Sequence, residues 1–126
     1  MHNSDLYIHA ADVGIEGISC IEAFSCGLVP VIADAPQSAT PQFALDERSL
    51  FKAGSAADLA SKIDYWIEHE AERKELSAKY AQRGAENYSL EYSVKKTLEM
   101  FQEAITAYHR KQKTDPKKIK KLRRHF

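Results

Sequence analysis

The chain is 126 residues long, 44% of them hydrophobic, and its formal net charge is zero. This length fits one domain. The hydrophobic content is high enough to form a core, which excludes a chain that is disordered by composition. A run of about 18 apolar residues is absent, which excludes a transmembrane helix, and the first residues lack the basic and apolar segments of a signal peptide.

The first third of the chain is predicted to form a β-α-β unit. Residues 5–9 have the pattern of a short strand, and residues 28–33 that of a buried strand. Between them Ser19 is a candidate N-cap, Glu22 follows three residues later as in a capping box, and Gly27 is a natural stop after the helix. Because crossovers between such strands are right-handed, we expect the two strands to be parallel.

The remainder is predicted to be mainly helical. Residues 34–48 are expected to form a loop or a short helical turn, followed by a small edge strand at residues 50–51. Ser55 is predicted to cap a helix that carries Trp66 into the core, and a second helix is expected to end near Gly84. A third helix, from residue 89 or 90 to about residue 111, is expected to pack back across the body.

The predicted fold class is therefore α/β: a partial Rossmann-like domain with a small parallel sheet covered by helices and a helical C-terminal region. Cys20 and Cys26 fall on different faces of the first helix, so we expect free thiols, as in a reducing cytoplasm. No Cys/His cluster has zinc-ligand spacing, and the glycine-rich motifs of NTPases and dinucleotide-binding proteins are absent. We accordingly expect no metal and no cofactor.

The segment from Gly14 to Val31 carries the most information about function. It contains the pairs Glu22-Ala23 and Pro30-Val31, with Gly27 between them. This pattern resembles the signature of retaining GT-B glycosyltransferases, in which a Glu-x7-Glu element, its second Glu followed by Ala, precedes a glycine and a Pro-Val strand. Weaker similarity continues over residues 51–67 and 88–108. The resemblance implies that residues 1–112 are a fragment of a C-terminal donor-binding domain, without the N-terminal acceptor domain.

Elementary chemistry agrees with a donor site in this segment. Gly17 allows close approach of the backbone, and the amide groups of Ile18 and Ser19 open a helix whose N-terminus stabilises phosphate. The resemblance assigns the second glutamate, here Glu22, to the ribose diol of a UDP- or GDP-sugar. The alternative is that Glu22 only completes a capping box with Ser19.

One position departs from the family pattern. Eight residues before Glu22 the chain has Gly14 instead of the first glutamate, which in the family lies beside the transferred sugar. Glu16 is the nearest carboxylate and is our candidate catalytic residue; a solvated loop acid is the alternative. His9 and the hydroxyls of Ser38 and Thr40 are weaker candidates for donor contacts.

The C-terminal segment, residues 109–126, is strongly basic. Residues 109–126 hold nine of the 18 Lys and Arg residues but one of the 18 acidic residues, so this segment is +8 and the rest is −8. Within it, residues 113–126 form a basic tail in which Ile119, Leu122 and Phe126 recur with helical spacing, as in a helix that binds an anionic membrane surface. Binding of nucleic acid and a merely solvated tail are the alternatives, and the acidic body argues against nucleic acid.

The sequence therefore predicts part of a glycosyltransferase that binds a nucleotide-diphosphate sugar and transfers the sugar with retention to a lipid or saccharide acceptor. The fragment alone is expected to be inactive, because half a donor site cannot hold both substrates. The location expected is cytoplasmic, or peripheral on the inner face of the membrane. The alternative is a non-catalytic α/β binding module that docks on a membrane or a protein partner through its basic tail.

Overall fold

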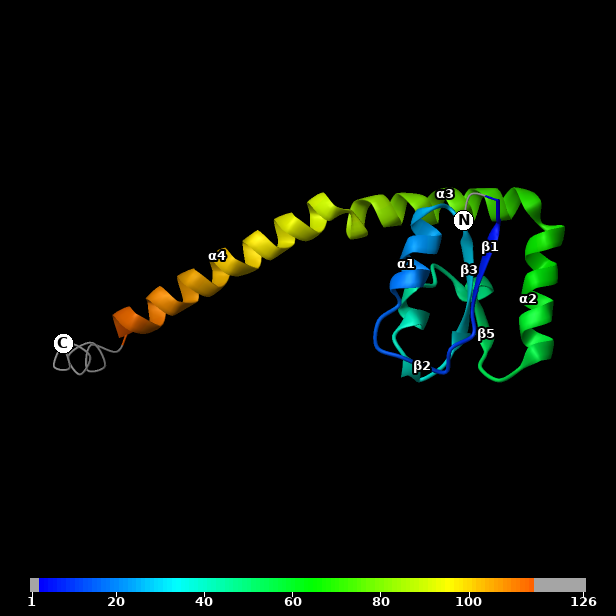
Figure 1. The fold of residues 1–126 in the computed structure, drawn as a ribbon, viewed down its shortest axis with the longest axis horizontal. Helices are drawn as coiled ribbons and strands as arrows, with labels where there is room; N and C mark the ends of the chain where they lie inside the picture. Colours follow the sequence, from blue (N-terminus) through cyan, green and yellow to red (C-terminus); the bar gives the residue numbers. More distant parts are fainter. Residues whose placement is uncertain (1–2, 115–126) are drawn as a thin grey trace. The chain divides into compact units, whose positions relative to one another are not determined.

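The computed structural model describes residues 3–114, which fall into two compact units that divide between Ser89 and Leu90. The first unit is an α/β fold and the second is one long helix (Figure 1). Their elements, in chain order, are β1 (Leu6–His9), β2 (Val13–Gly14), α1 (Ile18–Ser25), β3 (Val29–Asp34), β4 (Gln37–Ser38), the 3-10 turns η1 (Thr40–Phe43) and η2 (Glu47–Ser49), β5 (Leu50–Lys52), α2 (Ala56–Glu68), α3 (Glu70–Tyr88) and α4 (Leu90–Thr114).

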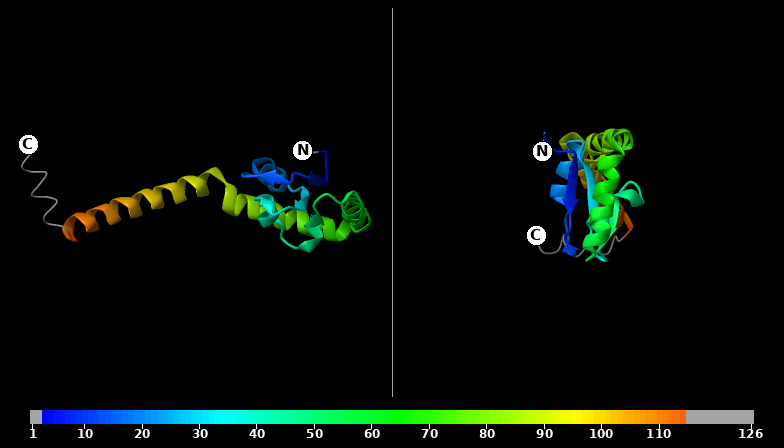
Figure 2. Two further views of the ribbon diagram at one scale, coloured as in Figure 1. Left: turned by 90° about the horizontal axis from the view of Figure 1, so that it is seen from below. Right: turned by 90° about the vertical axis from the view of Figure 1, so that its right-hand side faces the viewer.

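A parallel sheet of three strands, in the order β1-β3-β5, forms the centre of the first unit. Leu6 pairs with Val29 and Ile32 pairs with Leu50, so the β-α-β prediction and the edge strand are both confirmed. Helix α1 lies on one side of these strands and α2 on the other, as Figures 1 and 2 show from different directions. A second, two-stranded sheet pairs β2 with β4 beyond the carboxyl ends of β1 and β3.

The core fills the space between the sheet and the helices. Trp66 is completely buried, as predicted, and Ser55 caps α2 by accepting a hydrogen bond from the Asp58 amide at 3.2 Å. Gly27 has φ +84°, the left-handed conformation expected after a helix end. The core cluster consists of Cys20, Phe24, Val29, Val31, Ile32, Ala33, Phe43, Phe51, Trp66, Leu76 and Tyr80.

Two predictions about local structure are wrong. The N-cap of α1 is Gly17, and Ser19 is already inside the helix, so Ser19 and Glu22 do not form a capping box. Helix α3 does not end near Gly84 but continues to Tyr88. A Cβ atom at Gly84 would lie 2.7 Å from the Cα of Ser25, so this glycine permits the close contact of α3 with α1.

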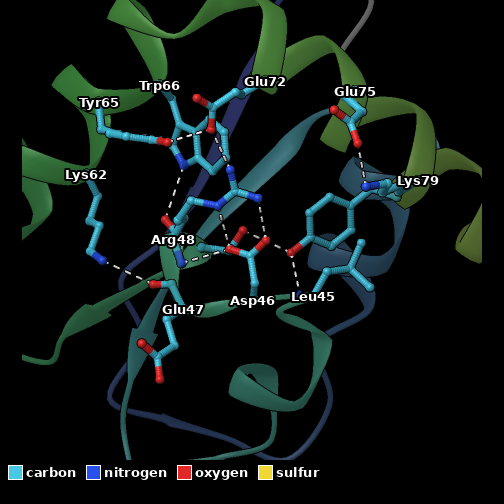
Figure 3. A network of polar contacts seen from close by, with 12 residues as sticks. Leu45, Asp46, Glu47, Arg48, Lys62, Tyr65, Trp66, Glu72, Glu75 and Lys79 are labelled. Carbon is cyan, nitrogen blue, oxygen red and sulfur yellow. Dashed lines mark hydrogen bonds and ion pairs between the residues drawn. The ribbon is translucent and has the colours of Figure 1, made fainter.

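A polar network fixes the η2 turn against α2 and α3 (Figure 3). The Arg48 guanidinium donates to both carboxylate oxygens of Asp46, at 3.0 and 2.7 Å, and to Glu72 at 2.6 Å. The indole N–H of Trp66 donates to the Arg48 carbonyl at 3.2 Å. The hydrogen bond from Arg48 lowers the pKa of Asp46 below its ordinary value. These contacts fix the segment that precedes β5. They lie at the amino end of β5 and not at the carboxyl ends of the strands.

The second unit is α4, whose predicted extent is confirmed to within a few residues. Its apolar side chains recur on one stripe and are exposed; they are Leu90, Val94, Leu98, Phe101, Ile105 and Tyr108. Packing of this helix against the body stays a prediction. The boundary between a domain at residues 1–112 and a tail at residues 113–126 also stays a prediction, because all but two residues of that tail lie outside the described part of the chain.

Candidate donor-binding site

The start of α1 is open to a ligand. Its N-cap, Gly17, has no side chain, and the first intrahelical bond runs from the Ile21 amide to the Gly17 carbonyl at 2.9 Å. The amides of Ile18, Ser19 and Cys20 precede that bond and so have no partner within the helix. Together with the helix dipole, free amides at this position favour an anion such as a diphosphate.

Packing of the η1 turn requires a glycine at position 17. It is buried, and a Cβ atom built on it would lie 2.5 Å from Cε2 of Phe43 and 2.7 Å from Cγ2 of Thr40. The η1 turn therefore presses directly against the start of α1. The sequence suggested a glycine kept for close approach of a ligand, whereas the structure gives it a second, steric reason.

Glu22 is the fifth residue of α1 and is exposed. Because Ser19 is not the N-cap, the capping role that competed with a ligand role for Glu22 is removed. Within residues 3–111, whose side chains the structure describes, the Glu22 carboxylate forms no hydrogen bond or ion pair. Its carboxylate is thus free to accept hydrogen bonds from a vicinal diol.

Glu16 lies in the loop immediately before Gly17 and is exposed, on the same approach to α1. Gly14, two residues earlier, is part of β2, where it pairs with Ser38. A Cβ atom at Gly14 would meet only the Ser38 hydroxyl, at 3.7 Å, so a side chain has room there. The structure thus places Glu16 at this edge and leaves an open space where the family has its first glutamate.

The weaker candidates also lie at this edge of the sheet. The Ser38 and Thr40 hydroxyls are 2.8 Å apart and bonded to each other, and Thr40 is completely buried. Ser38 and Thr40 therefore brace the loop between β4 and η1. His9, at the end of β1, approaches the hydroxyl of Tyr7 with its Nδ1 at 3.3 Å. Sequence reasoning missed Tyr7, because nothing in the pattern of β1 shows which element its hydroxyl reaches.

Residues 3–114 contain neither a metal-binding cluster nor a membrane-spanning helix. No group of three or more His, Cys, Asp or Glu residues in this part of the chain is arranged to hold a metal ion. None of its helices is long and apolar enough to cross a membrane. The chemical features at the carboxyl edge of the sheet are open amides, hydroxyls and exposed carboxylates, among them Glu16 and Glu22.

Comparison with known proteins identifies this arrangement. Residues 1–87 match the family model described as glycosyl transferases group 1. The chain belongs to that family. It is also similar to a solved structure, the catalytic domain of cholesterol-alpha-glucosyltransferase from Helicobacter pylori, with 54% identity and a TM-score of 0.64. The similarity covers 68% of this chain and 53% of that chain, so the chain spans about half the length of the solved protein. A search of curated proteins found no match.

Proposed function

We propose that this chain supplies the donor-binding part of a glycosyltransferase that takes a sugar from a UDP- or GDP-sugar and transfers it with retention to a lipid or saccharide acceptor. The observation that carries the proposal is the uncapped start of α1 followed by an exposed, unpaired Glu22. Family membership supports the reaction class. The relative from Helicobacter pylori is named for a sterol acceptor and a glucosyl group, which favours a lipid acceptor here.

The division of roles follows from chemistry at each position. The amides of Ile18 and Ser19 would bind the donor diphosphate, and Gly17, which has no side chain, would leave room for it. Glu22 would accept hydrogen bonds from the ribose hydroxyls. Glu16 would take the catalytic place beside the transferred sugar, where a carboxylate stabilises developing positive charge. The acceptor would bind to a further domain of the complete enzyme.

Binding measurements on the chain itself test this proposal. Titration with UDP, GDP, uridine and inorganic pyrophosphate, followed by amide NMR shifts, detects even millimolar binding. We expect UDP or GDP to bind more tightly than uridine or pyrophosphate, because the diphosphate and the ribose are recognised at separate points. Equal weak binding of all four compounds, or none, would leave the non-catalytic binding module as the better account.

A second proposal concerns residues 113–126. The +8 charge of residues 109–126 beside an acidic body favours attraction to an anionic membrane surface, and α4 leads directly into this segment. We propose a peripheral location on the inner, cytoplasmic face of the membrane, where a lipid acceptor would be available. Sedimentation with phosphatidylserine vesicles at low and high salt tests it, since electrostatic binding weakens as salt rises.

A further inference from the structure

Three polar side chains connect the end of β1 to the first turn of α1. The Tyr7 hydroxyl donates to Oγ of Ser19 at 2.9 Å, across twelve residues of sequence. The same hydroxyl lies 3.3 Å from Nδ1 of His9, and the two rings are 6.1 Å apart between centroids. Tyr7 and His9 are both half-buried, and Ser19 is exposed.

A tyrosine hydroxyl limits the directions that these hydrogen bonds can take, because it has a single proton to donate. A tyrosine hydroxyl has one proton, and here it points to Ser19. With that direction, the contact with His9 takes the tautomer that has a proton on Nδ1, which donates to the tyrosine oxygen. Ser19 already accepts from Tyr7, and its own hydroxyl proton has no acceptor among the residues whose side chains are described.

We propose that Tyr7 is a positioning residue of the donor site: it accepts a hydrogen bond from His9 and donates one to Ser19, which leaves the Ser19 proton free to donate to a phosphate oxygen at the start of α1. This inference rests on the proposed function. In this series of hydrogen bonds His9 donates to Tyr7, Tyr7 donates to Ser19, and Ser19 would donate to the phosphate. Hydrogen bonds aligned in this way polarise one another. A bond from Ser19 to phosphate would also be charge-assisted.

A purely structural role for Tyr7 predicts different behaviour. If the hydroxyl only ties β1 to α1, Tyr7→Phe and Ser19→Ala break the same bond and should weaken UDP binding by the same factor. If Tyr7 positions the Ser19 hydroxyl for phosphate, Ser19→Ala removes the phosphate contact itself and should weaken UDP binding more than Tyr7→Phe does, and Tyr7→Phe should add nothing in the Ser19→Ala background. The two single variants, measured beside the double variant, separate the two cases.

The experiment measures UDP affinity by NMR titration of the full chain and of Tyr7→Phe, Ser19→Ala and the double variant. We expect Tyr7→Phe to weaken UDP binding about three- to tenfold, as for loss of one well-placed hydrogen bond. In the Ser19→Ala background the same change should alter affinity by less than about twofold. Tyr88→Phe is the matched control, because the Tyr88 hydroxyl has no hydrogen bond among the described residues.

The protonation of His9 gives a readout that does not depend on UDP. Ring 15N shifts of His9 should report a proton on Nδ1 in the unaltered chain and a change of tautomer in Tyr7→Phe. If Tyr7→Phe does not fold, His9→Gln and His9→Leu replace it. The glutamine keeps a donor for Tyr7 and should hold UDP affinity within about twofold, whereas leucine should weaken it as Tyr7→Phe does.

These measurements distinguish failure of the positioning role from failure of the donor site. An equal loss of affinity in Tyr7→Phe and in Ser19→Ala, a loss from Tyr7→Phe that persists in the Ser19→Ala background, or an unprotonated Nδ1 in the unaltered chain overturns the positioning role while the donor site stands. Absence of UDP binding by the unaltered chain overturns the proposed function and this inference with it.

Discussion

Replacing Gly17 by alanine tests how the start of α1 is built. The added Cβ would meet the Phe43 ring at 2.5 Å and Thr40 at 2.7 Å, and both neighbours are buried. Over-packing of this kind costs about 1–3 kcal/mol of folding free energy. Gly14→Ala is the matched control, since its Cβ would have only Ser38 nearby at 3.7 Å and its φ is not positive. That change should leave stability equal or raise it by about 0.4–1 kcal/mol.

Urea unfolding followed by tryptophan fluorescence measures both variants, because Trp66 is the single tryptophan and is fully buried. The account predicts a lower midpoint for Gly17→Ala with an unchanged slope, and a Tm lower by roughly 4–8 °C for each kcal/mol lost. Gly17→Ala as stable as Gly14→Ala but unable to bind UDP would refute the packing argument. Gly17 would then be required for ligand approach alone.

Three further outcomes are expected. Glu22→Gln should leave the free energy of unfolding unchanged within about 0.5 kcal/mol, because Glu22 has no capping role, but should weaken UDP binding about tenfold while pyrophosphate binding stays the same. Burial raises the pKa of the Cys20 thiol from its ordinary 9.0 to about 11, so the unfolded state binds fewer protons between these values. Between these two pH values the free energy of unfolding should fall by up to about 1.4 kcal/mol per pH unit more in the unaltered protein than in Cys20→Ala. An identical pH profile for the unaltered protein and Cys20→Ala would contradict this. Deletion of residues 113–126 should abolish binding to phosphatidylserine vesicles with little change in Tm; undiminished binding would reject the membrane proposal.

The sequence was sufficient for the β-α-β unit, because the relevant signals are local. An apolar run, a glycine after a short helix and a second apolar run specify β1, α1 and β3 without knowledge of their neighbours. Gly27 illustrates this, since the residue after the helix needs a left-handed conformation whatever surrounds it. Ser55 and Trp66 were predictable for similar reasons: one caps its own helix and the other lies on its apolar face.

The errors occurred where tertiary contacts override a local signal. Ser19 and Glu22 have capping-box spacing, but Phe43 packs on Gly17 and the Tyr7 hydroxyl holds Ser19, so the helix starts earlier. Gly84 resembles a helix stop, yet α3 continues past it because a glycine there lets α3 pack against Ser25 of α1. The pairing of β2 with β4 involves two residues on each strand, too few for a periodic pattern.

Residue-resolved mapping of UDP binding tests the central claim most directly. In an amide NMR titration of the chain, the account predicts the largest shifts at Ile18, Ser19 and Cys20, with smaller shifts along α1 to Glu22, and none along α4. Saturable shifts at these amides that need about tenfold more UDP in Glu22→Gln would confirm a donor site at the start of α1. Shifts confined to α4, or no shifts at millimolar UDP, would contradict it.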